Sequence, residues 1–575
     1  MNSLVLAVLL PVVSALLGFF IVRLRNEFSF IGVILTLYFG LRIFLSTKTQ
    51  PFSYHLFDIG SINLSLYADS LAGLLLLIAG FLALLLILYS FRYIRNLSVP
   101  TQKYYYFYTL AGLATVNGLV LAKSLFLGLF FFGFLTLISY GLSILNSTPN
   151  ELSSKKLNLA WFVLCLPLVT MLLATFLLAA TNQGQAMLVL EDKIPLTQPA
   201  SLISFSLFII TILSLILTRP LIFTWLSELS YSLLALPLIL NNSLATYLLL
   251  RVNFSLFNLT SNSIFTNWLI ATSVILILLF TILGARQKKF VKNLALYSIS
   301  QAGYIMIAVV TALPIGIIGG LFHMINTALY QTALFLAFNS IAYRILPLQR
   351  AEGQDKTNPT TGTLIKKMPF TTGAFLIAGL SFAGIPPLNG FFSQWLIYQA
   401  LLSKIHGFMW IILAGILLGS IITLAFLLKT IQRLIFAPTI QKTNRVIEVG
   451  FSMSIAPSLL ALLAILFGIF VKKIPLNLFI LPSAKPFLGL IPKIEYWKPW
   501  PITTLMISWV GLGILFFLIS TNWRKRNFCY RVTKTPPLIS TVLSGLWDKF
   551  FLLKTCENKV TRYFHWLIKE GKGNG

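Results

Sequence analysis

The sequence predicts an all-α membrane protein that crosses the bilayer about 14 or 15 times. Of its 575 residues, 57% are hydrophobic and only 10% are charged, and the mean hydropathy is +0.88. A soluble protein of this length could not cover its surface with so few charges, so the solvent must be lipid. Apolar runs of about 20 residues match the hydrocarbon thickness at about 1.5 Å per helical residue, which favours helices over a β-barrel.

The apolar runs give the positions of the predicted membrane helices in chain order. They lie at 2–22, 28–46, 68–91, 104–122, 124–146, 158–181, 201–218, 220–250, 264–285, 294–312, 314–343, 370–402, 407–428, 451–471 and 503–520. The segments 220–250 and 370–402 are long enough, and rich enough in proline, to be broken. Between the second and third helices, residues 52–67 alternate polar and apolar side chains, which predicts a short surface hairpin and not a separate domain.

The net charge of +29 would suggest nucleic acid binding in a soluble protein. In a membrane protein, the positions of the basic residues instead indicate which loops face the cytoplasm, and no nucleic-acid partner is expected. Basic residues fall in alternate connections: Arg23 and Arg25; Arg92, Arg95 and Lys103; Lys155 and Lys156; Arg286, Lys288, Lys289 and Lys292; Arg344, Arg350, Lys366 and Lys367; and Lys429, Arg433, Lys442 and Arg445. The positive-inside rule then places these loops in the cytoplasm and the N-terminus outside. The basic stretch from Lys472 to Lys498 is an exception, because the count puts it outside.

The first apolar run could be a signal peptide, but no positive charge precedes it and Arg23 follows it, which favours a retained helix. The tail after the last helix is basic and aromatic, so it is either an interfacial amphipathic helix or a docking segment for a partner subunit.

Cys165, Cys529 and Cys556 lie far apart, and we expect neither a metal nor a disulfide framework. No nucleotide, flavin or iron–sulfur motif is visible, so no cofactor is expected in this chain.

Ionisable side chains within membrane helices are costly, and those present usually face a partner or a wet path. The candidates are Asp69, Lys123, Arg219, Glu228, His323, Lys404 and His406. Most lie near a predicted helix end, where snorkelling to the interface is the simpler explanation. His323 differs, because its helix places it near mid-depth. It is either a relay residue or a neutral histidine held by a backbone carbonyl or by Asn326.

The second signal is a helix break. The run GLSFAGIPPLNGFFSQ contains Pro386, Pro387, Asn389 and Gly390 inside an apolar segment, and two prolines remove backbone donors and clash with preceding carbonyls. Broken helices of this kind mark ion pathways in transporters, whereas a proline kink or a tight turn is the alternative. In the first half of the chain, Arg219, Pro220 and Pro237 bracket a possible second helix break. Its residue spacing matches that of the first break poorly.

These runs resemble one protein family. Two of them, KNLALYSISQAGYIMIAVV from Lys292 and GLFHMINTALYQTALFLAFNSI from Gly320, are similar to second-half helices of the antiporter-like subunits of complex I, membrane hydrogenases and Mrp antiporters. MPFTTGAFLIAGLSFAGIPPLNGFFSQWLI from Met368 resembles that family's broken helix. Supporting matches are ADSLAGLLLLIAGFLALLLILYS, LFLGLFFFGFLTLISYG and FTWL, and the resemblance covers most of residues 60–430.

The resemblance implies two pseudo-symmetric five-helix units with broken helices. It divides the chain into N-terminal helices at 1–100, a first half at 101–260, a second half at 261–430 with its break at 384–393, C-terminal helices at 431–521 and a tail at 522–575. It also implies a row of buried lysines, a glutamate and histidines that relays protons. This chain departs from that row. The family's glutamate aligns with Gly133, two of its lysines align with Ile216 and Gln331, and its second histidine aligns with Thr327. The lysine or glutamate of the broken helix aligns with Gln394. The pathway candidates left are His323, Lys292, Gln331, Gln394, Asn326 and Thr327.

Three functions compete at this point. The first is a membrane subunit of a complex I-like or Mrp-like assembly, with weak or lost proton translocation of its own; its redox chemistry would belong to other subunits of an NAD(P)H:quinone oxidoreductase-type complex. The second is an active proton or cation channel that uses His323 and water. The third is an unrelated membrane carrier. We expect a multi-pass location in a bacterial plasma membrane or a thylakoid, with other membrane subunits and the lipid bilayer as partners.

Overall fold

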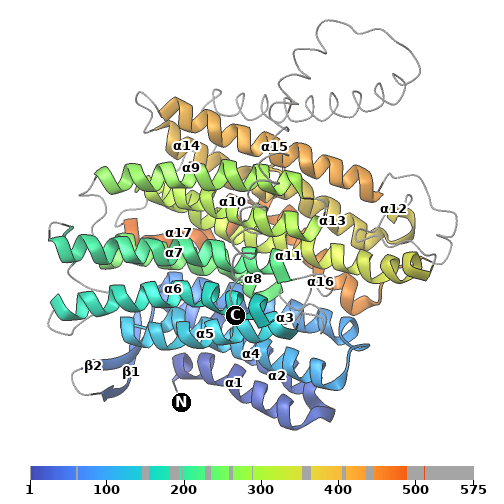
Figure 1. The fold of residues 1–575 in the computed structure, drawn as a ribbon, viewed down its shortest axis with the longest axis horizontal. Helices are drawn as coiled ribbons and strands as arrows, with labels where there is room; N and C mark the ends of the chain where they lie inside the picture. Colours follow the sequence, from blue (N-terminus) through green and yellow to red (C-terminus); the bar gives the residue numbers. More distant parts are fainter. Residues whose placement is uncertain are drawn as a thin grey trace, which may run out of the picture. The chain divides into compact units, whose positions relative to one another are not determined.

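The structure is a computed structural model, shown in Figure 1. It describes residues 2–59, 62–145, 154–181, 193–196, 198–226, 235–257, 263–287, 289–351, 364–403, 409–435, 446–488 and 511. These belong to one compact unit, Met1–Ile514; the helix predicted at 503–520, apart from residue 511, and the tail predicted at 522–575 lie outside the described residues. Eleven helices within the described ranges are long and apolar enough to span a membrane. The prediction of a polytopic helical membrane protein is therefore confirmed.

The chain begins with four helices and a hairpin. They are α1 (Ser3–Phe20), the short 3-10 turn η1 (Val22–Leu24), α2 (Arg25–Thr47), β1 (Phe52–Ile59), β2 (Ile62–Ala68), α3 (Ser70–Tyr93) and α4 (Val99–Leu121). α1 packs on α2 and α4, and α2 packs on α3. Side-chain oxygens of Asn2, Asp69 and Ser98 cap the starts of α1, α3 and α4, each accepting a backbone N–H.

The predicted hairpin is present as the antiparallel pair β1–β2, with Phe52 opposite Ala68 and Ile59 opposite Ile62. It is not a separate domain, because β2 packs against α1, α3 and α4. The backbone N–H of Lys123 donates to the carbonyl of Ser65 at 3.1 Å.

Five helices and a π-helical turn follow: α5 (Leu125–Leu145), α6 (Ser154–Thr181), α7 (Pro199–Leu226), α8 (Ala235–Leu250), the turn η3 (Arg251–Leu256) and α9 (Ser263–Arg286). One predicted boundary is wrong here. The sequence predicts a helix end at residue 218, whereas α7 continues through Arg219 and Pro220 to Leu226. A proline inside a membrane helix loses one hydrogen bond but is tolerated when neighbouring groups satisfy the freed carbonyl. Pro237 lies in the first turn of α8, where a missing donor costs little.

The next elements are α10 (Phe290–Val310), α11 (Pro314–Ala351), the short α12 (Leu364–Lys367), α13 (Pro369–Phe382) and α14 (Asn389–Leu402). All of α10 except Lys292 is buried, as are residues 316–342 of α11, so these two helices form the centre of the bundle. α11 contacts α10, α13, α14 and α16. The predicted helix break is confirmed, since residues 383–388 separate α13 from α14.

The last described elements are α15 (Met409–Ile435), α16 (Phe451–Ile469), the π-helical η6 (Lys472–Ile480) and α17 (Leu481–Leu488). The sequence predicts a basic connection from Lys472 onward, but residues 472–488 are helical and α17 packs against α3. Ser483 Oγ donates to the Ser70 carbonyl at 3.0 Å. The segment therefore lies beside the start of α3, at the face that the charge count assigns to the outside.

Candidate functional site

The polar face of α11 is the centre of the candidate site. His323, Asn326, Thr327 and Gln331 recur at helical spacing on this helix, and each is at most 4% exposed. Thr327 bonds within its own helix, because its hydroxyl donates to the Met324 carbonyl at 2.8 Å. The other three side chains reach neighbouring helices, so this face of α11 supplies the polar contacts of the bundle centre.

His323 lies between α10 and α14. Its Nε2 is 2.9 Å from Gln301 Oε1, and its Nδ1 is 3.0 Å from Ser393 Oγ. An amide oxygen only accepts hydrogen bonds, so Nε2 carries the proton of the neutral ring and Nδ1 accepts from Ser393. The Gln301 oxygen also accepts from the hydroxyl of Tyr330 at 3.0 Å. The histidine is thus held by a fixed set of neutral partners.

The Ser393 hydroxyl has two acceptors. Besides His323, it can donate to the Gly390 carbonyl at 3.0 Å. When it turns to Gly390, Nδ1 of His323 can carry a second proton and donate to the serine oxygen. The geometry therefore offers one extra proton position at His323, although the ring's partners among the described residues include no carboxylate to stabilise the charge.

The broken helix is joined to α11 by an amide pair. Asn389 Nδ2 donates to Asn326 Oδ1 at 2.7 Å, and Asn326 Nδ2 donates to the Asn389 carbonyl at 2.8 Å. Ser381, on the other side of the break, donates to Asn389 Oδ1. Pro386 and Pro387 lie between them, and Gly384 adopts a φ of +71°, which favours glycine. The break and His323, both predicted from the sequence, thus belong to one polar region.

A second polar chain leads away from α11 toward α8. Ser298 Oγ donates to Gln331 Oε1 at 3.3 Å, and Asn242 Nδ2 donates to the Ser298 carbonyl at 3.0 Å. Gln331 Nε2 and Asn242 Oδ1 are buried without a hydrogen-bond partner in the described part of the chain. Buried polar atoms of this kind are usually satisfied by water.

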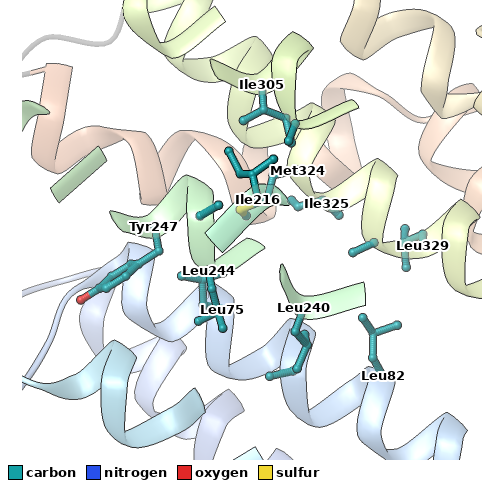
Figure 2. Close-up of a cluster of buried hydrophobic side chains, with 14 of the residues drawn as sticks. Leu75, Leu82, Ile216, Leu240, Leu244, Tyr247, Ile305, Met324, Ile325 and Leu329 are labelled. Atoms are coloured by element: carbon teal, nitrogen blue, oxygen red, sulfur yellow. The ribbon is translucent and has the colours of Figure 1, made fainter. Parts of the chain in front are cut away.

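An apolar cluster lies where side chains of α3, α7, α8, α10 and α11 meet. Figure 2 shows its labelled members, which come from α3, α7, α8, α10 and α11: Leu75, Leu82, Ile216, Leu240, Leu244, Tyr247, Ile305, Met324, Ile325 and Leu329. Ile216, where the resemblance implies a lysine, is 2% exposed and lies in this cluster. An ammonium group at this position would have apolar neighbours.

The other positions of the implied charge row are neutral as well. Gly133 lies on α5, and a Cβ built there would meet none of the described atoms within 4 Å. Gln394 on α14 is 3% exposed, packs over Gly384, and leaves its Oε1 without a partner among the described residues. Lys292 is half-buried near the start of α10, about 13.5 Å along the helix axis from Gln301 at about 1.5 Å per residue.

Of the remaining predicted ionisable residues, the structure describes Lys123, Asp69 and the backbone of Arg219. Lys123 is half-buried between α4 and α5. Arg219 is helical, and Glu228, Lys404 and His406 lie outside the described residues.

Asp69 forms a buried ion pair that the sequence analysis missed. Its Oδ1 is 2.7 Å from Nη2 of Arg251, and the side chains are 4% and 2% exposed. Arg251 also lies over the rings of Tyr247 and Phe487, at 5.0 and 5.9 Å. Burial, and then the Asp69 carboxylate, raise the pKa of Tyr67 in the adjoining strand. The lone arginine at the end of the apolar run YLLLR was the available signal for this pair.

These features define a polytopic helical membrane protein with a buried polar row beside a broken helix. Residues 122–423, more than half of the chain, match the family described as the transmembrane part of NADH:quinone oxidoreductase and Mrp antiporters. The chain belongs to this family. Membership does not fit the third hypothesis, an unrelated membrane carrier.

Individual proteins resemble this chain over different shares of its length. A Na(+)/H(+) antiporter subunit of Alkalihalophilus pseudofirmus is 27% identical over 456 residues, which cover 74% of this chain and 86% of that protein. An uncharacterised protein of Methanocaldococcus jannaschii is 37% identical over 132 residues, but the match spans only 23% of this chain and 26% of the relative. A chain in the structure of the Mrp complex from Dietzia sp. superposes with a TM-score of 0.74 at 18% identity, covering 97% of this chain and 60% of that one.

Proposed function

We propose that this chain is a membrane subunit of an Mrp-like or complex I-like assembly that translocates protons or other cations. Within it, the chain's own pathway transports weakly or not at all. The family assignment and the long match to an antiporter subunit support the first part. In keeping with the charge pattern, the N-terminus lies outside, and the host membrane is a bacterial plasma membrane or a thylakoid.

The observation that carries the second part is the neutral chemistry of the polar row. Ile216 lies in an apolar cluster, and Gln331 and Gln394 replace titratable groups that the resemblance implies. Glutamine can bond to water, but it cannot store a proton near neutral pH. A charge relay needs neighbouring sites whose charges shift one another's proton affinity, and the hydrogen-bond partners of His323 in the described ranges are neutral.

The experiment is cation flux through the purified assembly in liposomes, measured with an internal pH dye while the assembly turns over. His323→Gln is the test variant. His55→Gln is the matched control, because His55 lies in the exposed hairpin. We expect both variants to transport within about twofold of the wild type, which is less than about 0.5 kcal/mol in barrier height. A loss of about tenfold or more in His323→Gln alone would contradict the proposal.

That contrary result would favour the second candidate, an active channel. The specific observation behind it is the pair of buried polar atoms, Gln331 Nε2 and Asn242 Oδ1, that have no hydrogen-bond partner among the described residues. Waters at these atoms would extend the chain from α8 through Ser298 toward α11. In that case His323 would serve as the titratable station, and its replacement would stop the flux.

A further inference from the structure

Helix α16 runs beside the broken helix and contacts both of its parts, α13 and α14, together with α11. It lies beyond the family match at 122–423. Two positions near its ends touch the broken helix in different ways. One is Glu448, just before the helix begins, and the other is Gly468, one residue before it ends.

Glu448 provides the N-terminal cap of α13. Its Oε2 accepts the backbone N–H of Phe370 at 3.0 Å and that of Thr371 at 3.4 Å, and its Oε1 accepts the Thr371 hydroxyl at 2.5 Å. Met368, the residue at the local cap position, makes no side-chain cap in the described structure. A carboxylate is well suited here, because a helix N-terminus carries unpaired N–H donors and partial positive charge.

The same residue is tied to α11. Arg344 Nη2 donates to the backbone carbonyl of Glu448 at 3.0 Å. The start of α13 and the end of α11 are therefore held by one residue, separated from Phe370 by 78 positions in the chain.

Gly468 lies against the break itself. A Cβ built at this glycine would collide with the Pro387 carbonyl and lie 2.8 Å from the Asn389 nitrogen. Only glycine allows the backbone of α16 to approach this closely. Gly390 has equally little space for a side chain, since a Cβ there would collide with the Ser381 carbonyl. The break is thus packed against α16 on one side and against the end of α13 on the other.

The break leads directly to the candidate site. Asn389 exchanges hydrogen bonds with Asn326, and Ser393, one turn further along α14, bonds to His323. A shift of the break along α16 would move both residues together, because they share the short helix α14.

We propose that Glu448 and Gly468 make α16 a clamp that sets the position of the broken helix and, through Ser393, the hydrogen bonding of His323. Both are positioning residues. The clamp does not depend on whether this chain conducts protons, so its tests are structural and separate from the flux experiment.

The first test is hydrogen–deuterium exchange on the full chain in nanodiscs. Glu448→Gln is compared with Glu27→Gln, an exposed glutamate in the first turn of α2. Loss of the charged cap should speed amide exchange at residues 370–373 by about five- to thirtyfold, and the faster exchange should extend to the amides within 381–394. Glu448→Asp retains the carboxylate and should recover part of the protection. Faster exchange confined to 370–373 would overturn the clamp, because the cap would then be purely local.

The second test reads His323 directly by nitrogen-15 NMR of histidine-labelled protein. The chain has 4 histidines, and His323→Gln assigns the signal. The wild type should show the Nε2-protonated neutral ring. Gly468→Ala should change the tautomer ratio or Nδ1 shift of His323, whereas Gly373→Ala, on α13 with no described atom within 4 Å of the added Cβ, should not. If Gly468→Ala does not fold, Glu448→Gln supplies the same readout. An unchanged His323 signal in Glu448→Gln would refute the proposal.

Discussion

The Asp69–Arg251 pair allows the most direct test of how the start of α3 is held against a distant part of the chain. Asp69→Asn removes the negative charge but retains an oxygen that can accept the Ala72 N–H, now 2.9 Å from Asp69 Oδ1. Arg251→Met removes the guanidinium and retains most of the apolar stem. The two variants therefore change the ion pair and leave the cap of α3 in place.

The magnitude follows from the burial of the pair. With N–O contact at 2.7 Å and side chains 2% and 4% exposed, each single substitution leaves the other charge buried without its partner. Breaking such a pair costs about 3–5 kcal/mol, whereas removing both charges costs much less. We expect the double variant to be more stable than either single one, so the coupling energy should exceed the cost of one single substitution, about 3–5 kcal/mol.

The assay is equilibrium unfolding in mixed detergent micelles, followed by far-UV circular dichroism across the four members of the cycle. Arg42→Met is the control, because Arg42 is exposed on α2; it should change the free energy of unfolding by less than about 0.5 kcal/mol. Additive effects, with the double variant as unstable as the sum of the singles, would refute the reasoning. The pair would then contribute nothing to holding the start of α3 against η3.

Three other predictions follow from the same contacts. Ile216→Lys should lower the free energy of unfolding by several kcal/mol, because the ammonium group enters an apolar cluster; wild-type stability of this variant at pH 7 would contradict the prediction. Asn326→Ala should cost about 1–3 kcal/mol by leaving the Asn389 amide buried and unpaired, whereas Thr327→Val should cost less in the same unfolding assay, since that hydroxyl bonds within its own helix. Deleting the tail from Lys534 onward should release the chain from its partner subunits, and unchanged co-purification would count against a docking role.

The parts of this protein that sequence reasoning predicts well depend on local chemistry. The lengths of the apolar runs predict the helices, alternation at 52–67 predicts the hairpin, and Pro386 and Pro387 predict the break. The continuation of α7 through Pro220 was missed because tolerance of a helical proline depends on neighbouring helices. The membrane class and the break could therefore be predicted from composition and proline positions alone.

The contacts between distant segments could not be predicted in this way. Asp69 and Arg251 are 182 residues apart, and each taken alone is a charge near a helix end. Glu448 caps α13 although 78 positions separate it from Phe370, and its neighbours in the sequence do not indicate an N-cap. His323 was found because a single titratable group at mid-depth is visible in the sequence, whereas its partners Gln301 and Ser393 are ordinary polar residues.

The contacts at the start of α3 also bear on how the protein is made. The partner of Asp69, Arg251, comes 182 positions later in the chain, and the Ser483 hydroxyl that bonds to the Ser70 carbonyl comes 413 positions later. At about 5–20 residues per second, the ribosome needs roughly 10–40 s to reach the arginine and roughly 20–80 s to reach the serine. A newly inserted α3 therefore holds the Asp69 carboxylate without its arginine partner for that time, and the contacts at the start of α3 are complete only once α17 has been synthesised.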